Sequence, residues 1–226
     1  MRVVAISDVH GKWNKLTIPP CNVLVSTGDY SFRGEKHMVK DFHTWLNKQP
    51  ADHIISVQGN HEVWVEQNFE EAKLLAEKCC PKVHFIGDHG TVVIDGIKFH
   101  GSAITPWFYN WAWNRAKTLE EAQMRQIKYI KDEWDKIPID TNILLTHGPV
   151  YGILDQVPMQ TNNFDSHVGC QHLFNRLMQL ENCKIHICGH IHYSYGSKYF
   201  NGKQFYNASI CDEQYMPINP ITIIDY

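Results

Sequence analysis

No stretch of this sequence approaches the roughly 20 consecutive apolar residues that a membrane-spanning helix needs. The apolar run at the N-terminus, residues 3–6, is far too short for the hydrophobic region of a signal peptide, and the acidic Asp8 follows it closely. We therefore expect a chain that neither enters a membrane nor is exported, and a cytoplasmic location.

Runs of like charge, low-complexity tracts, internal repeats and linker-like stretches are also missing from the 226 residues. The formal net charge is -3 at pH 7, so no global positive field attracts a nucleic-acid backbone. We expect no stable nucleic-acid complex and a single domain spanning residues 1–226. With 43% hydrophobic residues, a chain of this length can bury a core without disulfides. The sequence leaves the oligomeric state open.

Cysteine is present, but its pattern does not favour a disulfide framework. The seven cysteines are odd in number and scattered, which fits free thiols in a reducing compartment. Histidine, by contrast, is abundant: 226 residues divided evenly among twenty types would give about 11 copies, and there are 14. This excess needs an explanation.

Short runs rich in β-branched residues end at glycine, aspartate or histidine, which predicts strands. Between them, longer segments have apolar residues three and four apart with charges between, which predicts helices. The predicted strands are 3–7, 23–27, 53–58, 83–86, 91–95, 97–100, 143–146, 184–188, 203–207 and 221–224. The predicted helices are 35–48, 66–79, 119–136 and 170–180. This order indicates an α/β architecture with mixed sheets.

Two local features allow more specific expectations. Asp95-Gly96 lies between two predicted strands and is a two-residue hairpin signal. In the third predicted helix, Met124, Ile127 and Ile130 have helical spacing, so we expect them to pack in the core.

Polar residues that can bind metals lie just after five of the predicted strands. In α/β sheets, ligands bind beyond the carboxyl ends of the strands, where loops from distant segments converge. Glycine beside most of these polar residues permits tight turns and close backbone approach. The motifs are Asp8-Val9-His10, Gly28-Asp29, Gly59-Asn60-His61-Glu62, Thr146-His147-Gly148 and Gly189-His190-Ile191-His192.

The potential ligand atoms are carboxylate and amide oxygens and imidazole nitrogens, and no cysteine lies inside the motifs. This set suits manganese, iron, zinc or cobalt and disfavours a structural zinc site of the cysteine type. Two aspartates, four histidines and an asparagine exceed what one ion needs. They fit two ions roughly 3.5 to 4 Å apart that share a carboxylate, the arrangement used for in-line displacement at phosphorus.

In their order and spacing, these five motifs resemble those of the calcineurin-like metallophosphoesterase superfamily. Further segments resemble the branch of small metallophosphoesterase-domain-containing proteins, which are similar to class III cyclic-nucleotide phosphodiesterases. These segments are Gly101-Ser102, Pro106-Trp107-Phe108 to Asn114, His147-Gly148-Pro149, Gly152-Ile153-Leu154-Asp155, Val168-Gly169-Cys170 and Asn207-Ala208-Ser209. The resemblance implies a four-layer α-β-β-α sandwich with two mixed β-sheets.

The resemblance also implies a role for each motif residue. The implied ligands of one divalent ion are Asp8, His10, Asp29 and His192. The implied ligands of the second ion are Asp29, Asn60, His147 and His190, so that Asp29 bridges. A hydroxide between the ions would attack phosphorus, and the catalytic His61 would protonate or stabilise the leaving oxygen. Manganese is the favoured metal, with iron, zinc or cobalt as alternatives, and the substrate-binding residues remain unknown.

Charge counting independently supports an anionic substrate. Two divalent ions contribute +4, two aspartates remove 2 and a bridging hydroxide removes 1, which leaves about +1 at the site. A locally cationic centre can therefore exist in a chain whose net charge is -3.

The loop after Asp29 departs from the protein serine/threonine phosphatases of the superfamily. Those enzymes have an aspartate where this chain has Phe32, and that aspartate orients their catalytic histidine. Another group must therefore support His61 here. Arg33 matches the arginine that grips phosphate in those enzymes, with an ordinary surface arginine as the alternative.

Three of the seven tryptophans lie in the segment from Trp107 to Trp113. We expect at least one of these rings to pack in the core and at least one other to form a pocket wall that can stack a nucleobase. Among the histidines outside the motifs, His167 is a candidate to overhang the site, and most others are expected to be structural or solvated.

These observations favour a phosphoesterase with two metal ions, more specifically a phosphodiesterase acting on a small nucleotide-like phosphate ester. A phosphomonoesterase and a nuclease are alternatives, although the length leaves little room for a capping domain and the charge balance offers no obvious groove. The alternative from another class is a non-catalytic scaffold of the same fold. Such scaffolds commonly lose metal ligands, whereas this chain retains all seven.

Overall fold

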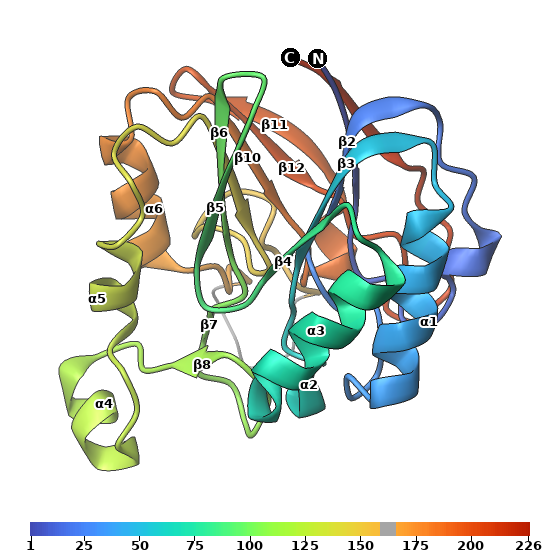
Figure 1. Cartoon of the computed structure of the whole chain (residues 1–226). Helices are drawn as coiled ribbons and strands as arrows, with labels where there is room; N and C mark the ends of the chain where they lie inside the picture. Colours follow the sequence, from blue (N-terminus) through green and yellow to red (C-terminus); the bar gives the residue numbers. More distant parts are fainter. Residues whose placement is uncertain (159–165) are drawn as a thin grey trace.

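Two β-sheets lie at the centre of the molecule, with helices outside each of them (Figure 1). The computed structural model describes residues 1–158 and 166–226. Among these residues, no helix has both the length and the apolar character needed to cross a membrane.

The first sheet is built from short apolar strands in the order β13-β1-β2-β3-β4. Strands β1 to β4 are parallel, and β13 is antiparallel to β1. Parallel strands covered on both faces take near-continuous apolar runs, and β1 and β2 do so here. The strand bounds are β1 (Arg2–Ile6), β2 (Cys21–Ser26), β3 (Ala51–Val57), β4 (Val83–Ile86) and β13 (Thr222–Asp225).

The second sheet has the order β11-β12-β10-β9-β6-β5 and is also mixed. Its four inner strands are parallel, whereas the edge strands β11 and β5 are antiparallel to their neighbours. The bounds are β5 (Gly90–Ile94), β6 (Ile97–Ser102), β9 (Ile143–Thr146), β10 (Ile185–Cys188), β11 (Gly196–Phe200) and β12 (Lys203–Asn207). A separate small sheet pairs β7 (Thr105–Pro106) with β8 (Asn114–Arg115).

The helices complete a four-layer α-β-β-α sandwich, which confirms the expected fold class (Figure 1). On the side of the first sheet lie α1 (Lys36–Asn47), α2 (Val63–Gln67) and α3 (Phe69–Cys79). On the side of the second sheet lie α5 (Ile130–Trp134) and α6 (Gln171–Gln179), while α4 (Leu119–Arg125) projects from the body. One apolar cluster contains residues of both sheets and α1, and a second joins the second sheet to α5 and α6.

The prediction of one helix over 119–136 is wrong. Gln126 adopts a left-handed conformation with φ of 55°, which ends α4, and a new helix begins at Ile130. The residues between form backbone hydrogen bonds with Ala116 instead, since Ala116 donates to Lys128 O and accepts from the Ile130 N–H. Ile130 is buried as expected. Met124 is 72% exposed, so its expected place in the core is also wrong.

The predicted strands all have counterparts, and the predicted hairpin is confirmed. Asp95 and Gly96 join β5 to β6 with φ of 48° and 78°, the positive values that a two-residue hairpin requires. Strands β7, β8 and β11 were not predicted. Two-residue strands carry no periodic signal, and four of the five residues of β11 are exposed, so β11 lacks the alternation that marks a strand.

Candidate metal centre

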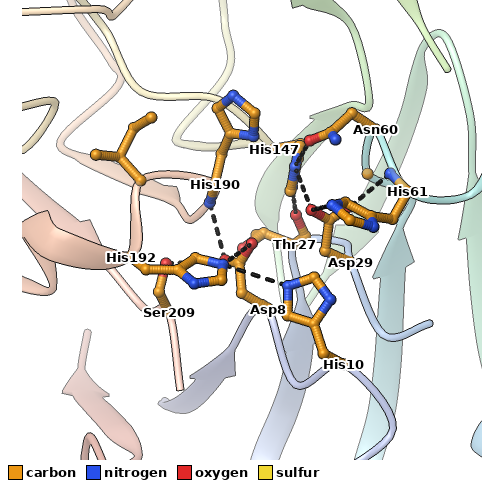
Figure 2. A network of polar contacts seen from close by, with 12 residues as sticks. Asp8, His10, Thr27, Asp29, Asn60, His61, His147, His190, His192 and Ser209 are labelled. Carbon is orange, nitrogen blue, oxygen red and sulfur yellow. Dashed lines mark hydrogen bonds and ion pairs between the residues drawn. The ribbon is translucent and has the colours of Figure 1, made fainter. Parts of the chain in front are cut away.

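The eight residues predicted to form the site converge where the carboxyl ends of the two sheets meet (Figure 2). The residues that follow β1, β2 and β3 of the first sheet are Asp8, His10, Asp29, Asn60 and His61. The residues that follow β9 and β10 of the second sheet are His147, His190 and His192. Because parallel strands end at a common edge, loops far apart in the chain meet here.

The potential ligand atoms form three overlapping groups, each with its atoms within 4.8 Å of one another. The groups are Asp8 with His10 and His192, His10 with Asp29 and His61, and Asp29 with His147 and His190. Asn60 joins the last group, since its Oδ1 lies 2.8 Å from His147 Nε2. The structure thus brings all eight residues together and gives Asp29 a shared position. Their assignment to particular ions stays a prediction.

Backbone carbonyl oxygens decide which nitrogen of three imidazoles faces the site. The Nδ1 atoms lie 3.2 Å from Ser31 O in His10, 2.8 Å from Asp212 O in His192 and 2.7 Å from Thr27 O in His147. A carbonyl can only accept, so Nδ1 donates and a neutral ring keeps its Nε2 lone pair for the site. The Nε2 atoms of His10 and His192 are 3.3 Å apart. Two ring nitrogens this close favour a proton or a metal cation between them.

Asp8 is held in place by the second sheet. Its Oδ2 accepts hydrogen bonds at 2.8 Å from Ser209 Oγ and from the backbone N–H of His190. Ser209 is itself fixed, because its backbone N–H donates to Asn207 Oδ1 at 3.1 Å. The other oxygen, Asp8 Oδ1, is buried, accepts no hydrogen bond from the described part of the chain and lies 3.4 Å from His192 Nε2. This oxygen is available to a cation.

Glu62 is a buried residue of the site for which the sequence predicted no role. Its Oε2 accepts from the backbone N–H groups of Asp29 and Gly59, both at 2.8 Å. Its Oε1 accepts from Ser31, from the backbone N–H at 3.2 Å and from Oγ at 2.9 Å. Glu62 thereby ties the loop after β2 to the loop after β3. Its one sequence signal is its place directly after Asn60-His61.

The two aspartates dominate the electrostatics of the site. Burial lowers the pKa of His147, but the charge of Asp29 and its hydrogen bond outweigh burial and raise that pKa to about 9. Burial likewise lowers the pKa of His192, while the negative charge of the adjacent Asp8 carboxylate, whose Oδ1 lies 3.4 Å from His192 Nε2, raises it to about 9. Burial raises the pKa of Asp29, yet the charges of His147 and His61 bring it well below the usual range. The negative potential that draws protons to these rings also favours divalent cations.

Four of the eight residues adopt positive φ, a region that non-glycine residues rarely occupy. The angles are 51° at Asp8, 37° at His10, 52° at Asp29 and 70° at His190. Such conformations cost about 1 to 3 kcal/mol each and persist only where the surrounding structure imposes them. Their concentration on predicted ligands is an independent mark of a functional site.

Glycine is required beside two of the ligands because the backbone passes so close. A Cβ at Gly59 would lie 2.3 Å from Asp29 Oδ1, and one at Gly189 would lie 2.2 Å from Asp8 Oδ2 and 2.0 Å from Ser7 Oγ. These contacts confirm the close approach expected from the motifs.

Replacing Gly189 by alanine is expected to displace the Asp8 carboxylate and weaken the binding of a divalent cation by about 10- to 100-fold, the usual scale when the support of a ligand is disturbed. Calorimetric titration of the metal-stripped variant with Mn²⁺ measures the change. Gly148→Ala is a matched control, because the nearest atom to its new Cβ would be Thr105 Cγ2 at 3.6 Å. Equal affinities for wild type and Gly189→Ala would contradict the role of this close approach.

His61 is supported by the residue that replaces the missing aspartate. Its Nδ1 lies 3.1 Å from the backbone oxygen of Phe32, and its backbone N–H donates to Asp29 Oδ1 at 2.8 Å. Its ring packs against Trp111, with the ring centres 4.3 Å apart. The Phe32 carbonyl therefore fixes the orientation of the imidazole, and Nε2 lies 3.9 Å from Asp29 Oδ2.

The tryptophans between Trp107 and Trp113 have different surroundings. Trp113 is 4% exposed and belongs to the core, as expected for at least one of these rings. Trp111 lies beside His61 and also contacts Arg33, whose guanidinium carbon is 4.8 Å from the Trp111 ring centre. The guanidinium of Arg125 lies over the ring of Trp107, with its central carbon 3.3 Å from the ring centre. A role for these rings in stacking a nucleobase stays a prediction.

Several histidines outside the motifs are structural, as expected. Burial lowers the pKa of His43 to about 4 and the pKa values of His100 and His186 to about 3, so these rings are neutral parts of the packing. His167 Nδ1 lies 2.5 Å from Oδ1 of Asp155. Its predicted position above the site stays a prediction.

The two-sheet sandwich and its centre of carboxylates and histidines define a metallophosphoesterase. Residues 1–194 match the family model described as calcineurin-like phosphoesterase. This match covers most of the chain and all eight residues of the centre. The chain therefore belongs to the calcineurin-like phosphoesterase family, which confirms the resemblance of its motifs and supports a metal-dependent phosphoester hydrolase.

Curated relatives agree with this assignment over nearly the whole chain. The chain is 31% identical over 247 residues to human Metallophosphoesterase domain-containing protein 1, covering 99% of this chain and 70% of that protein. It is 30% identical over 227 residues to UPF0046 protein K07C11.7 of Caenorhabditis elegans, covering 94% of this chain and 71% of that protein.

Solved structures share the fold at much lower identity. The phosphopantetheinyl hydrolase PptH of Mycobacterium tuberculosis superposes with a TM-score of 0.60 at 15% identity, covering 94% of this chain and 90% of that chain. The protein TT1561 of Thermus thermophilus superposes with a TM-score of 0.54 at 13% identity, covering 91% of this chain and 88% of that chain. These similarities show a common architecture.

Proposed function

We propose that this metallophosphoesterase is a phosphodiesterase that uses two divalent cations, preferably manganese, to hydrolyse a small nucleotide-like phosphate ester. The observation that carries the proposal is the position of Asp29. It belongs to a group with His147 and His190 and to another with His10 and His61, and His10 leads on to Asp8 and His192. A carboxylate between two sets of ligands is what a pair of cations at one phosphorus requires.

The residues present fit such cations. The proposed ligands are Asp8, His10, Asp29 and His192 for one ion and Asp29, Asn60, His147 and His190 for the other. The free oxygen of Asp8 and the adjacent Nε2 atoms of His10 and His192 support this assignment. Oxygen and imidazole donors suit manganese, with iron, zinc or cobalt as alternatives. When bound, such ions polarise the phosphoryl oxygens and lower the pKa of water.

The residues of the chain have separate proposed tasks in the reaction. His61 gives a proton to the leaving oxygen, because Nδ1 is committed to the Phe32 carbonyl and Nε2 is the nitrogen left for the substrate. Glu62 keeps the Asp29 loop in register with the loop that carries Asn60 and His61. The shape of the site thus depends on residues that never touch phosphate.

We also propose that residues 1–226 act as a single domain in the cytoplasm. All seven cysteines are free, which supports a reducing compartment. The alternative of a non-catalytic scaffold has less support, because the complete set of potential ligands is present and its members lie together.

Metal removal tests the proposal directly. The chain stripped with EDTA is expected to show no hydrolysis of bis(p-nitrophenyl) phosphate, and addition of Mn²⁺ is expected to restore it, with slower turnover of the monoester p-nitrophenyl phosphate. A screen of cyclic nucleotides, dinucleotides and monoesters would then identify the substrate. Absence of turnover with manganese, iron and zinc, together with no metal at near-stoichiometric level in the purified protein, would favour the scaffold.

A further inference from the structure

A groove of about 520 Å³ begins one ring away from His61. Trp111 belongs to both places, because it lines the groove and packs against the His61 imidazole. A backbone hydrogen bond of 3.0 Å from Ala112 N to Asn60 O fixes the groove segment to the loop of His61. Figure 1 shows this segment, around β7 and β8, beside α2, which begins directly after Glu62. The groove therefore lies next to the candidate metal centre, with the Trp111 ring between the groove and His61.

The proposed reaction places the leaving group of the substrate on the side of this groove. Water loses a proton to solvent and supplies the oxygen of the new P–O bond, and the P–O bond to the leaving group breaks. His61 delivers a proton to the leaving oxygen and regains one from solvent. The leaving oxygen must then lie within hydrogen-bond reach of His61. Whatever is attached to that oxygen therefore lies beside His61, whose ring packs against Trp111 at the border of the groove.

Two features of the groove indicate the chemistry of its occupant. Aromatic side chains of Trp107, Tyr109 and Trp111 line it, and such rings favour a flat partner. Its cations are already paired. Arg115 lies 3.9 Å from Glu66 and also pairs with Asp88, and Lys128 lies 3.6 Å from Asp88 and 3.8 Å from Glu133. Cations that already pair with carboxylates attract an additional phosphate only weakly, so the groove suits an uncharged group.

We propose that this groove is the subsite for the leaving group of the substrate and that it selects an uncharged planar ring. The proposal rests on the phosphodiesterase function proposed above. Its volume falls within the range of small-molecule pockets and is sufficient for a bicyclic ring. Trp107 is its main determinant, because Arg125 over the ring fixes the indole in place.

Two methyl phosphodiesters that differ only in the leaving group test the proposal. One carries 4-methylumbelliferyl, which is planar and bicyclic, and the other carries hexafluoroisopropyl, which is compact and also an acidic alcohol. The measured quantity is the ratio of kcat/KM for the planar over the compact substrate with Mn²⁺. Trp107→Ala is expected to lower this ratio about tenfold, the scale of one lost stacking contact, and Trp107→Phe is expected to restore most of it.

Two further variants control the experiment. Tyr109→Ala removes a second ring of the groove and is expected to lower the ratio as well, which keeps the test open if Trp107→Ala does not fold. Tyr199→Ala removes a ring that is 70% exposed on the edge strand β11, and the ratio is expected to stay at the wild-type value. An unchanged ratio in folded Trp107→Ala and Tyr109→Ala would overturn the subsite and leave the proposed function standing. No hydrolysis of either substrate by the wild type would overturn the proposed function itself.

Discussion

Replacing His61 by alanine is expected to slow manganese-dependent hydrolysis of bis(p-nitrophenyl) phosphate by about 100-fold or more, the usual scale for an acid-base group. The Phe32 carbonyl and Trp111 hold the imidazole in one orientation, with Nε2 directed to the site, and the substitution removes this proton donor. The loss should grow as the leaving alcohol becomes less acidic, because a poorer leaving group depends more on the proton. Steady-state rates with a series of aryl and alkyl esters measure both effects.

A histidine away from the centre provides the control for this experiment. His37 is exposed on α1, and His37→Ala is expected to keep the wild-type rate with every ester. If His61→Ala also kept the wild-type rate, His61 would have no part in the mechanism. An equal loss of rate with all leaving groups would instead mean that His61 positions other residues of the centre and does not protonate the leaving oxygen.

Replacing Glu62 by alanine is expected to lower the free energy of unfolding by about 3 to 5 kcal/mol. The substitution leaves three buried backbone N–H groups, those of Asp29, Ser31 and Gly59, without their acceptor. Burial, which contributes most, and the charge of Asp29 raise the pKa of Glu62 to about 8, so its hydrogen bonds hold a strongly desolvated group. Urea denaturation of the metal-free proteins measures the difference.

Two further variants show whether the loss of stability in Glu62→Ala comes from its hydrogen bonds or from the removal of a carboxylate in general. Glu70→Ala removes an exposed carboxylate from the first turn of α3 and is expected to change the free energy of unfolding by less than about 0.5 kcal/mol. Glu62→Gln keeps the size of the side chain but turns an NH₂ group toward these donors, so an intermediate loss is expected. A loss below about 1 kcal/mol in Glu62→Ala would mean that the two loops are held together by other contacts.

The potential ligands were predictable because their chemistry is carried by residue type and by position after a strand. Asp29 follows β2 and His147 follows β9, so each lies at the carboxyl end of its own sheet, where ligand-binding loops are expected. The sheets were predictable for a similar reason, since buried parallel strands have continuous apolar sequences. Both inferences depend on the local sequence and on the general geometry of parallel sheets.

The supporting groups were not predictable because they act through the backbone. Phe32 supports His61 with its carbonyl, which every residue type has, and Glu62 accepts from N–H groups that the sequence does not distinguish. The end of α4 at Gln126 has the same origin. No glycine or proline marks it, and hydrogen bonds between Ala116 and a later part of the chain decide it. Such features depend on contacts that exist only in the folded chain.

The division of the centre between the two sheets has a thermodynamic consequence. The proposed ligand sets take Asp8, His10, Asp29 and Asn60 from the first sheet and His147, His190 and His192 from the second. A cation bound to both halves therefore resists their separation, and the resistance to unfolding becomes a function of the free ion concentration. For each site, every tenfold rise above the dissociation constant adds about 1.4 kcal/mol. The free concentration of the metal ion in the cell would then affect the stability of the folded protein as well as its rate of hydrolysis.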